Sequence, residues 1–254
     1  MTARRFSPVA ALTLGVLAGC GGATPETRAP APADAAPTRR VIEDTAADDD
    51  SDVEIVGARG RMEVADIEAG FRPHAAQLEA CYTEKVGRRR WLGGQVTLKW
   101  WIQKDGTVTQ VQIAESDLGA WPVEKCLLDL ARQMNFAAPK GGDADFSLPL
   151  EFSAKGRPIT LGEEETTAQV TPRLADLVEC RRGDGGAALA VPDDLVVTAY
   201  VGTRGKVQSV GFAAAGEVAV PDAWAECAAR KIQGWTLRDP RGMVVKLTFA
   251  PGGS

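Results

Sequence analysis

The chain contains an internal repeat, and this repeat limits the fold more than any other feature of the sequence. A shift of 99 positions places Cys81 on Cys180, and two further inserted residues place Cys126 on Cys227. Similarity at a fixed period indicates two copies of one structural unit. The remaining aligned positions are prolines, turn glycines and strand residues: Pro73 with Pro172, Gly106 with Gly205, Trp101 with Tyr200, and Phe152 with Phe249.

Each copy has the pattern helix, strand, strand, helix, strand. Residues 95–102 alternate between apolar and polar, as a half-buried strand does, and Asp105-Gly106 predicts a hairpin turn into the next strand. We therefore predict an α+β fold of two tandem α-β-β-α-β modules, each with two helices on one face of a three-stranded antiparallel sheet. The first helices are expected to start at Pro73 and, behind a Thr171 cap, at Pro172; Pro122 opens a second helix, 146–152 forms a last strand, and Arg204-Gly205 makes the second hairpin turn.

Four of the five cysteines are expected to form two disulfides. In each copy one cysteine lies on each of the two helices that share a sheet face, so Cys81 can pair with Cys126 and Cys180 with Cys227. An oxidising compartment favours such bonds. The chain has no C-x-x-C motif and no cysteine–histidine cluster, the usual signs of a redox or zinc site. We expect no metal and no cofactor.

The amino terminus predicts export and lipidation. Residues 1–19 carry two arginines, then a short apolar run, then small residues, as a signal peptide does. The run Leu17-Ala18-Gly19-Cys20 resembles a bacterial lipobox. This resemblance implies cleavage before Cys20 and acylation of Cys20, and Gly21 favours the periplasmic leaflet of the outer membrane. The alternative is an ordinary signal peptide with a cysteine near the cleavage point by chance.

Composition divides the rest of the chain. Residues 20–61 are rich in Ala, Pro and acidic residues, so we expect a disordered tether whose acidity keeps it solvated or serves as a docking motif. The net charge of −5 argues against a nucleic-acid-binding protein. The predicted boundaries are the signal peptide 1–19, the tether 20–61, module 1 at 62–156, a linker at 157–170 containing Glu163, Glu164 and Glu165, and module 2 at 171–250.

The first copy resembles a known family. Residues 94–102, Gly106-Thr107-Val108, Phe136 and the strand that ends at Phe152 are similar to a TonB C-terminal-type module. With Cys81-Tyr82 and Cys126 added, the match is to the variant at the C-terminus of myxobacterial gliding-motility proteins. The second copy resembles it less, since it lacks the Cys-Tyr pair and the Gly-Gly before its first strand. The resemblance implies a non-catalytic periplasmic module that binds envelope proteins, in part by pairing an exposed sheet edge with an extended peptide.

Aromatic and basic residues provide the candidate binding sites. Trp101 and Tyr200 are expected on the helix-free sheet faces. There we expect them either to bind a partner or to pack the two sheets together. Arg88, Arg89 and Arg90 directly precede Trp91. We expect them either to bind an anionic glycan, a lipid headgroup or an acidic tail, or to form a solvated loop held by the acidic tether. His74, the only histidine, is expected to be structural or at the surface.

We therefore predict a lipid-anchored adaptor, not an enzyme, on the periplasmic side of the outer membrane. Its partners are other envelope proteins, and the family resemblance implies a motility or transport complex. The alternative is a structural envelope protein that binds peptidoglycan or another polyanion through Arg88 to Arg90. An enzyme with a site that has no sequence signature is a third hypothesis. Salt separates the first two, because polyanion binding weakens steeply with ionic strength.

Overall fold

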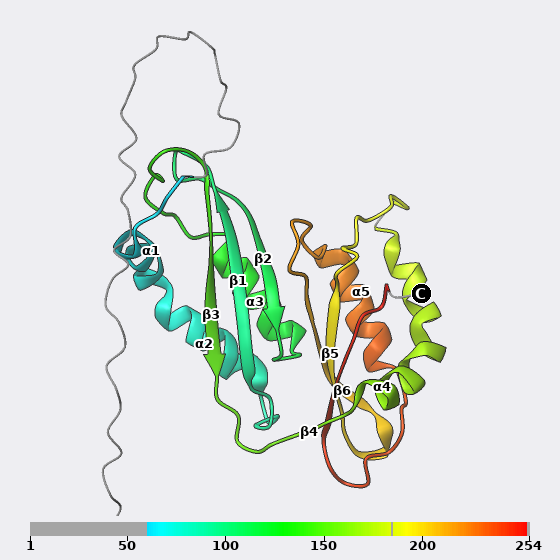
Figure 1. The fold of residues 1–254 in the computed structure, drawn as a ribbon. Coiled ribbons are helices and arrows are strands. Elements are labelled where there is room, and N and C mark those ends of the chain that lie inside the picture. Colours follow the sequence, from blue (N-terminus) through cyan, green and yellow to red (C-terminus); the bar gives the residue numbers. More distant parts are fainter. Residues whose placement is uncertain (1–59, 184, 253–254) are drawn as a thin grey trace, which may run out of the picture. The chain divides into compact units, whose positions relative to one another are not determined.

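The structure is a computed structural model that describes residues 60–183 and 185–252. Residues Gly94–Ile102 alternate between apolar and polar and form a strand with one buried face, which lies at the centre of the first sheet. We call residues 60–157 the first half and residues 158–252 the second half. The first half contains, in chain order, α1 (Val64–Phe71), the 3-10 turn η1 (Arg72–His74), α2 (Ala75–Val86), β1 (Gly94–Ile102), β2 (Val108–Ser116), α3 (Trp121–Ala131) and β3 (Ala144–Phe152) (Figure 1).

The first sheet has the order β2-β1-β3, and both pairings are antiparallel. Val96, Leu98 and Trp100 of β1 are fully buried, and the Trp100 indole donates to the Ala131 carbonyl at the end of α3 (3.2 Å). The opposite face of β1 carries Trp101, which is only partly buried. The prediction of an α+β fold with a three-stranded antiparallel sheet is confirmed.

The second half follows a similar element order but has a larger sheet. Its order is β4-β7-β5-β6, with β4 parallel to β7. The three strands expected here therefore become four, because a two-residue strand gives no pattern that sequence can reveal. The elements are β4 (Ile159–Thr160), α4 (Glu163–Val170), the 3-10 helix η2 (Thr171–Arg181), β5 (Val196–Val201), the turn η3 (Thr203–Gly205), β6 (Val207–Ala213), α5 (Asp222–Gln233) and β7 (Val245–Phe249).

Two helix starts differ from expectation. Pro73 lies in η1, and α2 begins two residues later at Ala75. Thr171 makes no capping hydrogen bond, and Val170 occupies the cap position of η2. The reason is the same in both places: a preceding helix, α1 or α4, runs directly into the segment, so there is no free helix start whose N–H groups need a cap.

Both expected disulfides are present. Cys81 and Cys126 join α2 to α3 with their Cα atoms 5.6 Å apart, and Cys180 and Cys227 join η2 to α5 with 5.5 Å. Each bond links the two helical segments of its half, as the repeat indicated. Within residues 60–183 and 185–252, no helix is long and apolar enough to cross a membrane.

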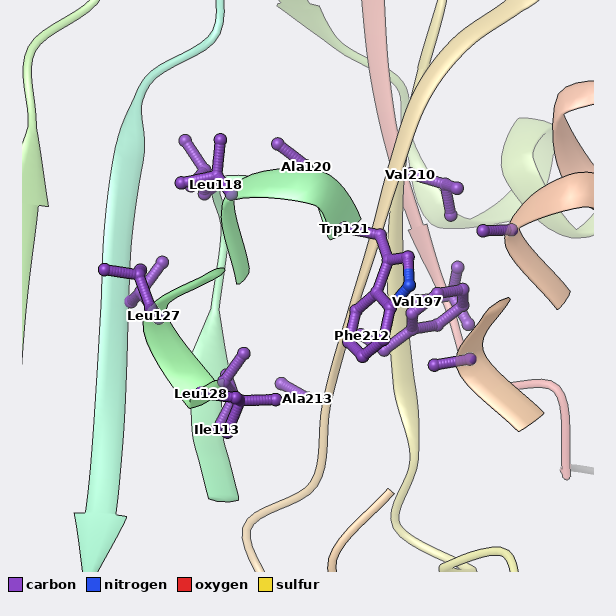
Figure 2. Packing of buried hydrophobic residues seen from close by; sticks show 14 of the residues in the cluster. Ile113, Leu118, Ala120, Trp121, Leu127, Leu128, Val197, Val210, Phe212 and Ala213 are labelled. Atoms are coloured by element: carbon purple, nitrogen blue, oxygen red, sulfur yellow. The ribbon is translucent and has the colours of Figure 1, made fainter. Parts of the chain in front are cut away.

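The two halves share one hydrophobic core. Trp121 at the start of α3 packs edge-on against Phe212 of β6, with ring centroids 5.7 Å apart (Figure 2). Phe212 in turn packs against Trp224 of α5 (5.3 Å). The inner strands β2 and β6 meet here, where the Ala214 N–H donates to the Ile113 carbonyl (3.0 Å). The described residues accordingly belong to a single compact unit.

Candidate functional site

The outer edge of β3 is the longest strand edge that the described residues leave uncovered. β3 is nine residues long and pairs only with β1. The inner edges β2 and β6 face each other, and the remaining outer edge, β4, has two residues. An unpaired edge presents a row of backbone N–H and C=O groups that an extended peptide can bind.

Pro149 identifies which backbone groups point outward from β3. It stands opposite Thr97 in the ladder with β1, and proline has no N–H to give to such a ladder. Within sheets, proline is tolerated where the missing N–H faces solvent. Since backbone direction alternates along a strand, Asp145, Ser147 and Glu151 also point their N–H and C=O groups away from β1.

The corresponding edge of the second sheet is covered. β7 stands beside β5 as β3 stands beside β1, but its outer side pairs with Ile159 and Thr160 of β4. The Ile159 N–H donates to the Val244 carbonyl (3.1 Å), and the Leu161 N–H donates to the Lys246 carbonyl (2.8 Å). α4 packs beside the same strand. The two halves therefore differ in the accessibility of their outer edges.

The helix-free face of the first sheet carries a second group of side chains, each of them partly buried. The Lys99 Nζ lies 4.6 Å from the centre of the Trp101 ring, a cation–π contact, and 3.5 Å from an Asp145 carboxylate oxygen. Trp101 is partly buried. Lys99 and Trp101 lie on β1, with β3 between them and the outer edge, so a peptide added to that edge would lie two strands, or about 10 Å, from their backbone.

Tyr200 does not form an exposed site. Its side chain is 1% exposed and lies between the two halves, where its hydroxyl donates to the Asp117 carbonyl (3.3 Å). The ring against it is Trp91, 5.0 Å away, and not Trp101. Burial raises the pKa of the Tyr200 hydroxyl, with smaller contributions from Asp117 and Glu124. Tyr200 is therefore buried at the junction of the two halves, but against Trp91 and not, as expected, against Trp101.

Arg88, Arg89 and Arg90 are exposed and lie next to a second basic segment. The Lys155 N–H donates to the Arg90 carbonyl (2.6 Å), which brings the loop after β3 beside the loop after α2. Lys155 and Arg157 are exposed there as well. Within the described residues, no hydrogen bond or ion pair engages the side chains of these five cations, which we call the basic loops. The sequence did not predict that Lys155 and Arg157 join the three arginines.

A buried carboxylate joins the halves, and no sequence signal predicted it. Glu124 of α3 is fully buried. It accepts hydrogen bonds from the Ser116 hydroxyl (2.7 Å), the Ala120 N–H (3.3 Å) and the Phe212 N–H of β6 (2.9 Å). Burial raises the Glu124 pKa from 4.5 to about 7, although these donors lower it. The absence of a side chain at Gly211 makes room for the carboxylate, since a Cβ atom there would clash with it.

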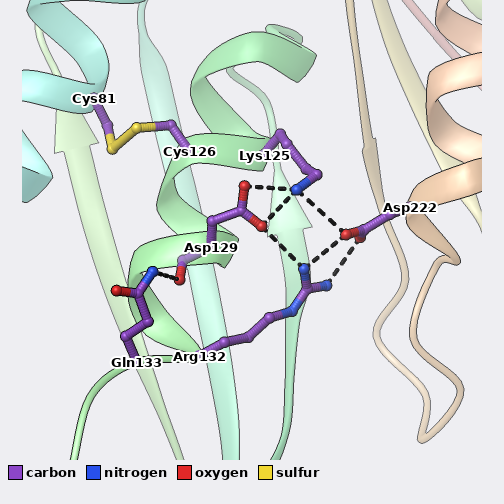
Figure 3. Close-up of polar contacts among 7 residues, drawn as sticks. All are labelled: Cys81, Lys125, Cys126, Asp129, Arg132, Gln133 and Asp222. Carbon is purple, nitrogen blue, oxygen red and sulfur yellow. Dashed lines mark hydrogen bonds and ion pairs between the residues drawn. A yellow bond between two sulfur atoms is a disulfide. The ribbon is translucent and has the colours of Figure 1, made fainter.

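A charged cluster marks the rim of the same junction. Asp222, the first residue of α5, receives two hydrogen bonds from the Arg132 guanidinium (2.7 and 2.9 Å). Lys125 contacts Asp222 at 3.5 Å and Asp129 at 2.6 Å (Figure 3). Burial raises the pKa of Asp222, but the hydrogen bond and charge of Arg132 outweigh it, so the pKa is lowered overall. The cluster links α3 to the start of α5 across the junction.

The other residues singled out in the sequence lie at the surface or outside the described residues. His74 Nδ1 lies 3.1 Å from the Gln77 amide oxygen at an exposed site. Glu163, Glu164 and Glu165 form the first turn of α4, where acidic side chains suit the positive end of a helix. Within the part of the chain that the structure describes, no three His, Cys, Asp or Glu side chains gather as metal ligands. The signal peptide, Cys20 and all but the last two residues of the tether lie outside the described residues.

The chain was compared with protein-family models, with curated proteins and with solved structures, and none of the three comparisons gives a match.

Proposed function

We propose that this chain is a non-catalytic adaptor that binds an extended segment of another cell-envelope protein along the outer edge of β3. The observation that most supports this function is that the described residues pair the nine-residue strand β3 on one side only, whereas the corresponding edge of β7 is covered by β4. Backbone pairing supplies affinity in this mode, and side chains beside the edge supply specificity. The side chains of Trp101 and Lys99 extend from β1, two strands away, and could provide part of it.

The similar element order of the two halves suggests a common origin. We infer that they are tandem copies of one TonB C-terminal-like module, of which the second has lost its binding role. The order α2-β1-β2-α3-β3 parallels η2-β5-β6-α5-β7, and each half carries one helix–helix disulfide. The lipobox-like run at Cys20 supports attachment to the periplasmic face of the outer membrane, and the family resemblance supports a role in a motility or transport complex.

Photo-crosslinking in cells that produce the chain tests the edge directly. A photoreactive residue at Glu151 is combined with Ser147→Pro, which removes an outward N–H but no bond to β1. The proposal predicts an adduct with another protein that Ser147→Pro abolishes. The matched control Ser147→Ala keeps the N–H and should keep the adduct. An adduct that persists with Ser147→Pro would show that the partner does not pair with this edge.

A second function, polyanion binding, is favoured by the basic loops. Five exposed cations without ion-pair partners among the described residues suit phosphate or carboxylate groups. Arg88→Gln, Arg89→Gln and Arg90→Gln together should then release the chain from peptidoglycan in a sedimentation assay, and so should added salt. Salt-independent sedimentation that survives the substitutions would exclude this function.

A further inference from the structure

The basic loops run directly into a pair of exposed apolar side chains. Only Pro158 separates Arg157 from Ile159, the first residue of β4, whose side chain is 48% exposed. The Ile159 N–H donates to the Val244 carbonyl (3.1 Å), which brings Met243, 49% exposed, beside it. Unpaired cations and exposed apolar side chains therefore adjoin on one stretch of the surface.

Ile159 and Met243 line a groove that is largely apolar. Its volume is about 650 Å³. Leu161, Pro240 and Val245 line it as well, and each of these three side chains is only partly buried. Contiguous exposed apolar side chains with polar groups around them mark an interaction site, whereas a single exposed apolar residue does not. The groove is therefore a candidate surface for a partner with an apolar component.

The rim of the groove adds a further cation. Arg241 is exposed, and no hydrogen bond or ion pair engages its side chain among the described residues. Two carboxylates line the groove: Glu165 pairs with Arg238 (3.0 Å), and Asp239 accepts a hydrogen bond from the Arg241 backbone N–H (2.9 Å). Arg241 and the basic loops therefore give this surface an excess of positive charge, although the net charge of the chain is −5.

A bilayer that contains anionic lipids offers both kinds of group that this surface can bind. Its headgroup phosphates attract Arg and Lys side chains, and the boundary below the headgroups removes apolar side chains from water. A glycan polyanion offers the charge alone, so it gives no role to the exposed side chains of Ile159 and Met243. The combination of charge and apolar surface favours a lipid bilayer.

We propose that the basic loops, Ile159, Met243 and Arg241 form a docking surface for a bilayer that contains anionic phospholipids. The cations lie on the phosphates, and the two apolar side chains enter the boundary between headgroups and acyl chains. This contact goes beyond the adaptor function and does not depend on it. An acyl group at Cys20, which the sequence predicts, would hold the chain at such a bilayer, where even a weak contact suffices to orient it.

Vesicle sedimentation tests the docking surface in the absence of a lipid anchor. The probe is the mature chain that the sequence predicts, from residue 20 onward, with Cys20→Ser so that no acyl group is attached. It should sediment with vesicles of equal parts phosphatidylcholine and phosphatidylglycerol, and much less with vesicles of phosphatidylcholine alone. Replacing the three arginines 88–90 by glutamine should weaken binding to the anionic vesicles about a hundredfold. Ile159→Ser/Met243→Ser should weaken it about tenfold.

Each variant has a matched control elsewhere on the described surface. Arg72→Gln/Lys104→Gln/Arg230→Gln makes the same change in net charge at exposed positions on η1, on the turn between β1 and β2, and on α5. Val178→Ser/Val218→Ser removes two apolar side chains that are 63% and 48% exposed. Both controls should bind the anionic vesicles as the parent chain does. Thermal unfolding of all variants checks that they are folded.

Three outcomes would overturn the proposal. A parent chain that does not sediment with the anionic vesicles has no such surface. Binding that the arginine variant loses and Ile159→Ser/Met243→Ser keeps in full would indicate a surface for polyanions in general. Retention on peptidoglycan without vesicle binding would assign the basic loops to the glycan instead. None of these results bears on the edge of β3, because the partner adduct from Glu151 is measured separately.

Discussion

The two halves of this molecule have similar element orders but differ in what they leave open. In the second half, Thr198 and Tyr200 on the helix-free face of β5 are buried against the first half, and the outer edge of β7 is covered by β4. In the first half, Trp101 is only partly buried, and β3 pairs with no strand other than β1 in the described residues. Under the proposed function, this difference makes the first half the binding half and the second half its support.

The largest expected effect comes from the closed face. Trp121→Ala removes the ring that packs against Phe212 across the junction, and should lower the free energy of unfolding by about 4 kcal/mol. Trp101→Ala, on the open face, is the matched control and should cost about 1 kcal/mol. Chemical denaturation followed by fluorescence measures both. Equal losses would break the comparison, since Trp101 would then be as well packed as the junction.

The two disulfides should stabilise the two halves by similar amounts. The bonds close loops of similar length, with sequence separations of 45 and 47. Replacing Cys81 and Cys126 by alanine should therefore lower the free energy of unfolding as much as replacing Cys180 and Cys227, by about 3 kcal/mol for each pair. Thermal unfolding of the two double variants, with non-reducing mass analysis to confirm the remaining bond, checks this. A much smaller loss for one pair would show that its half contributes little to the shared core.

Glu124 should make the junction sensitive to pH. Between pH 4.5 and about 7 the folded chain holds a proton on Glu124 that the unfolded chain has released, so a rise in pH lowers the free energy of unfolding. The expected loss over this window is about 3 kcal/mol. Glu124→Gln has no charge to bury and should flatten the profile, whereas Glu151→Gln, at an exposed site, should not. A profile unchanged by Glu124→Gln would contradict the raised pKa.

Sequence predicted the first sheet well because its signals are local. The alternation of Val96, Leu98 and Trp100 needs only the period of a strand, and the cysteine pairs follow from the repeat. The junction was not predictable in this way. Glu124 lies on a helix among apolar residues, and only the fold brings it to the Phe212 N–H, 88 residues away. Tyr200 was placed on the correct face, but the sequence could not show that Trp91 covers it.

The most direct test of the account compares the two outer edges in one experiment. A photoreactive residue is placed at Ser147 of β3 in one strain and at Thr248 of β7, also exposed, in another. If the outer edge of β3 binds the partner, Ser147 should give a discrete adduct with another envelope protein and Thr248 should give none. An adduct from Thr248, or an absence of adducts at Ser147 while Arg89 gives one, would contradict the claim that the open edge of the first half is the binding site.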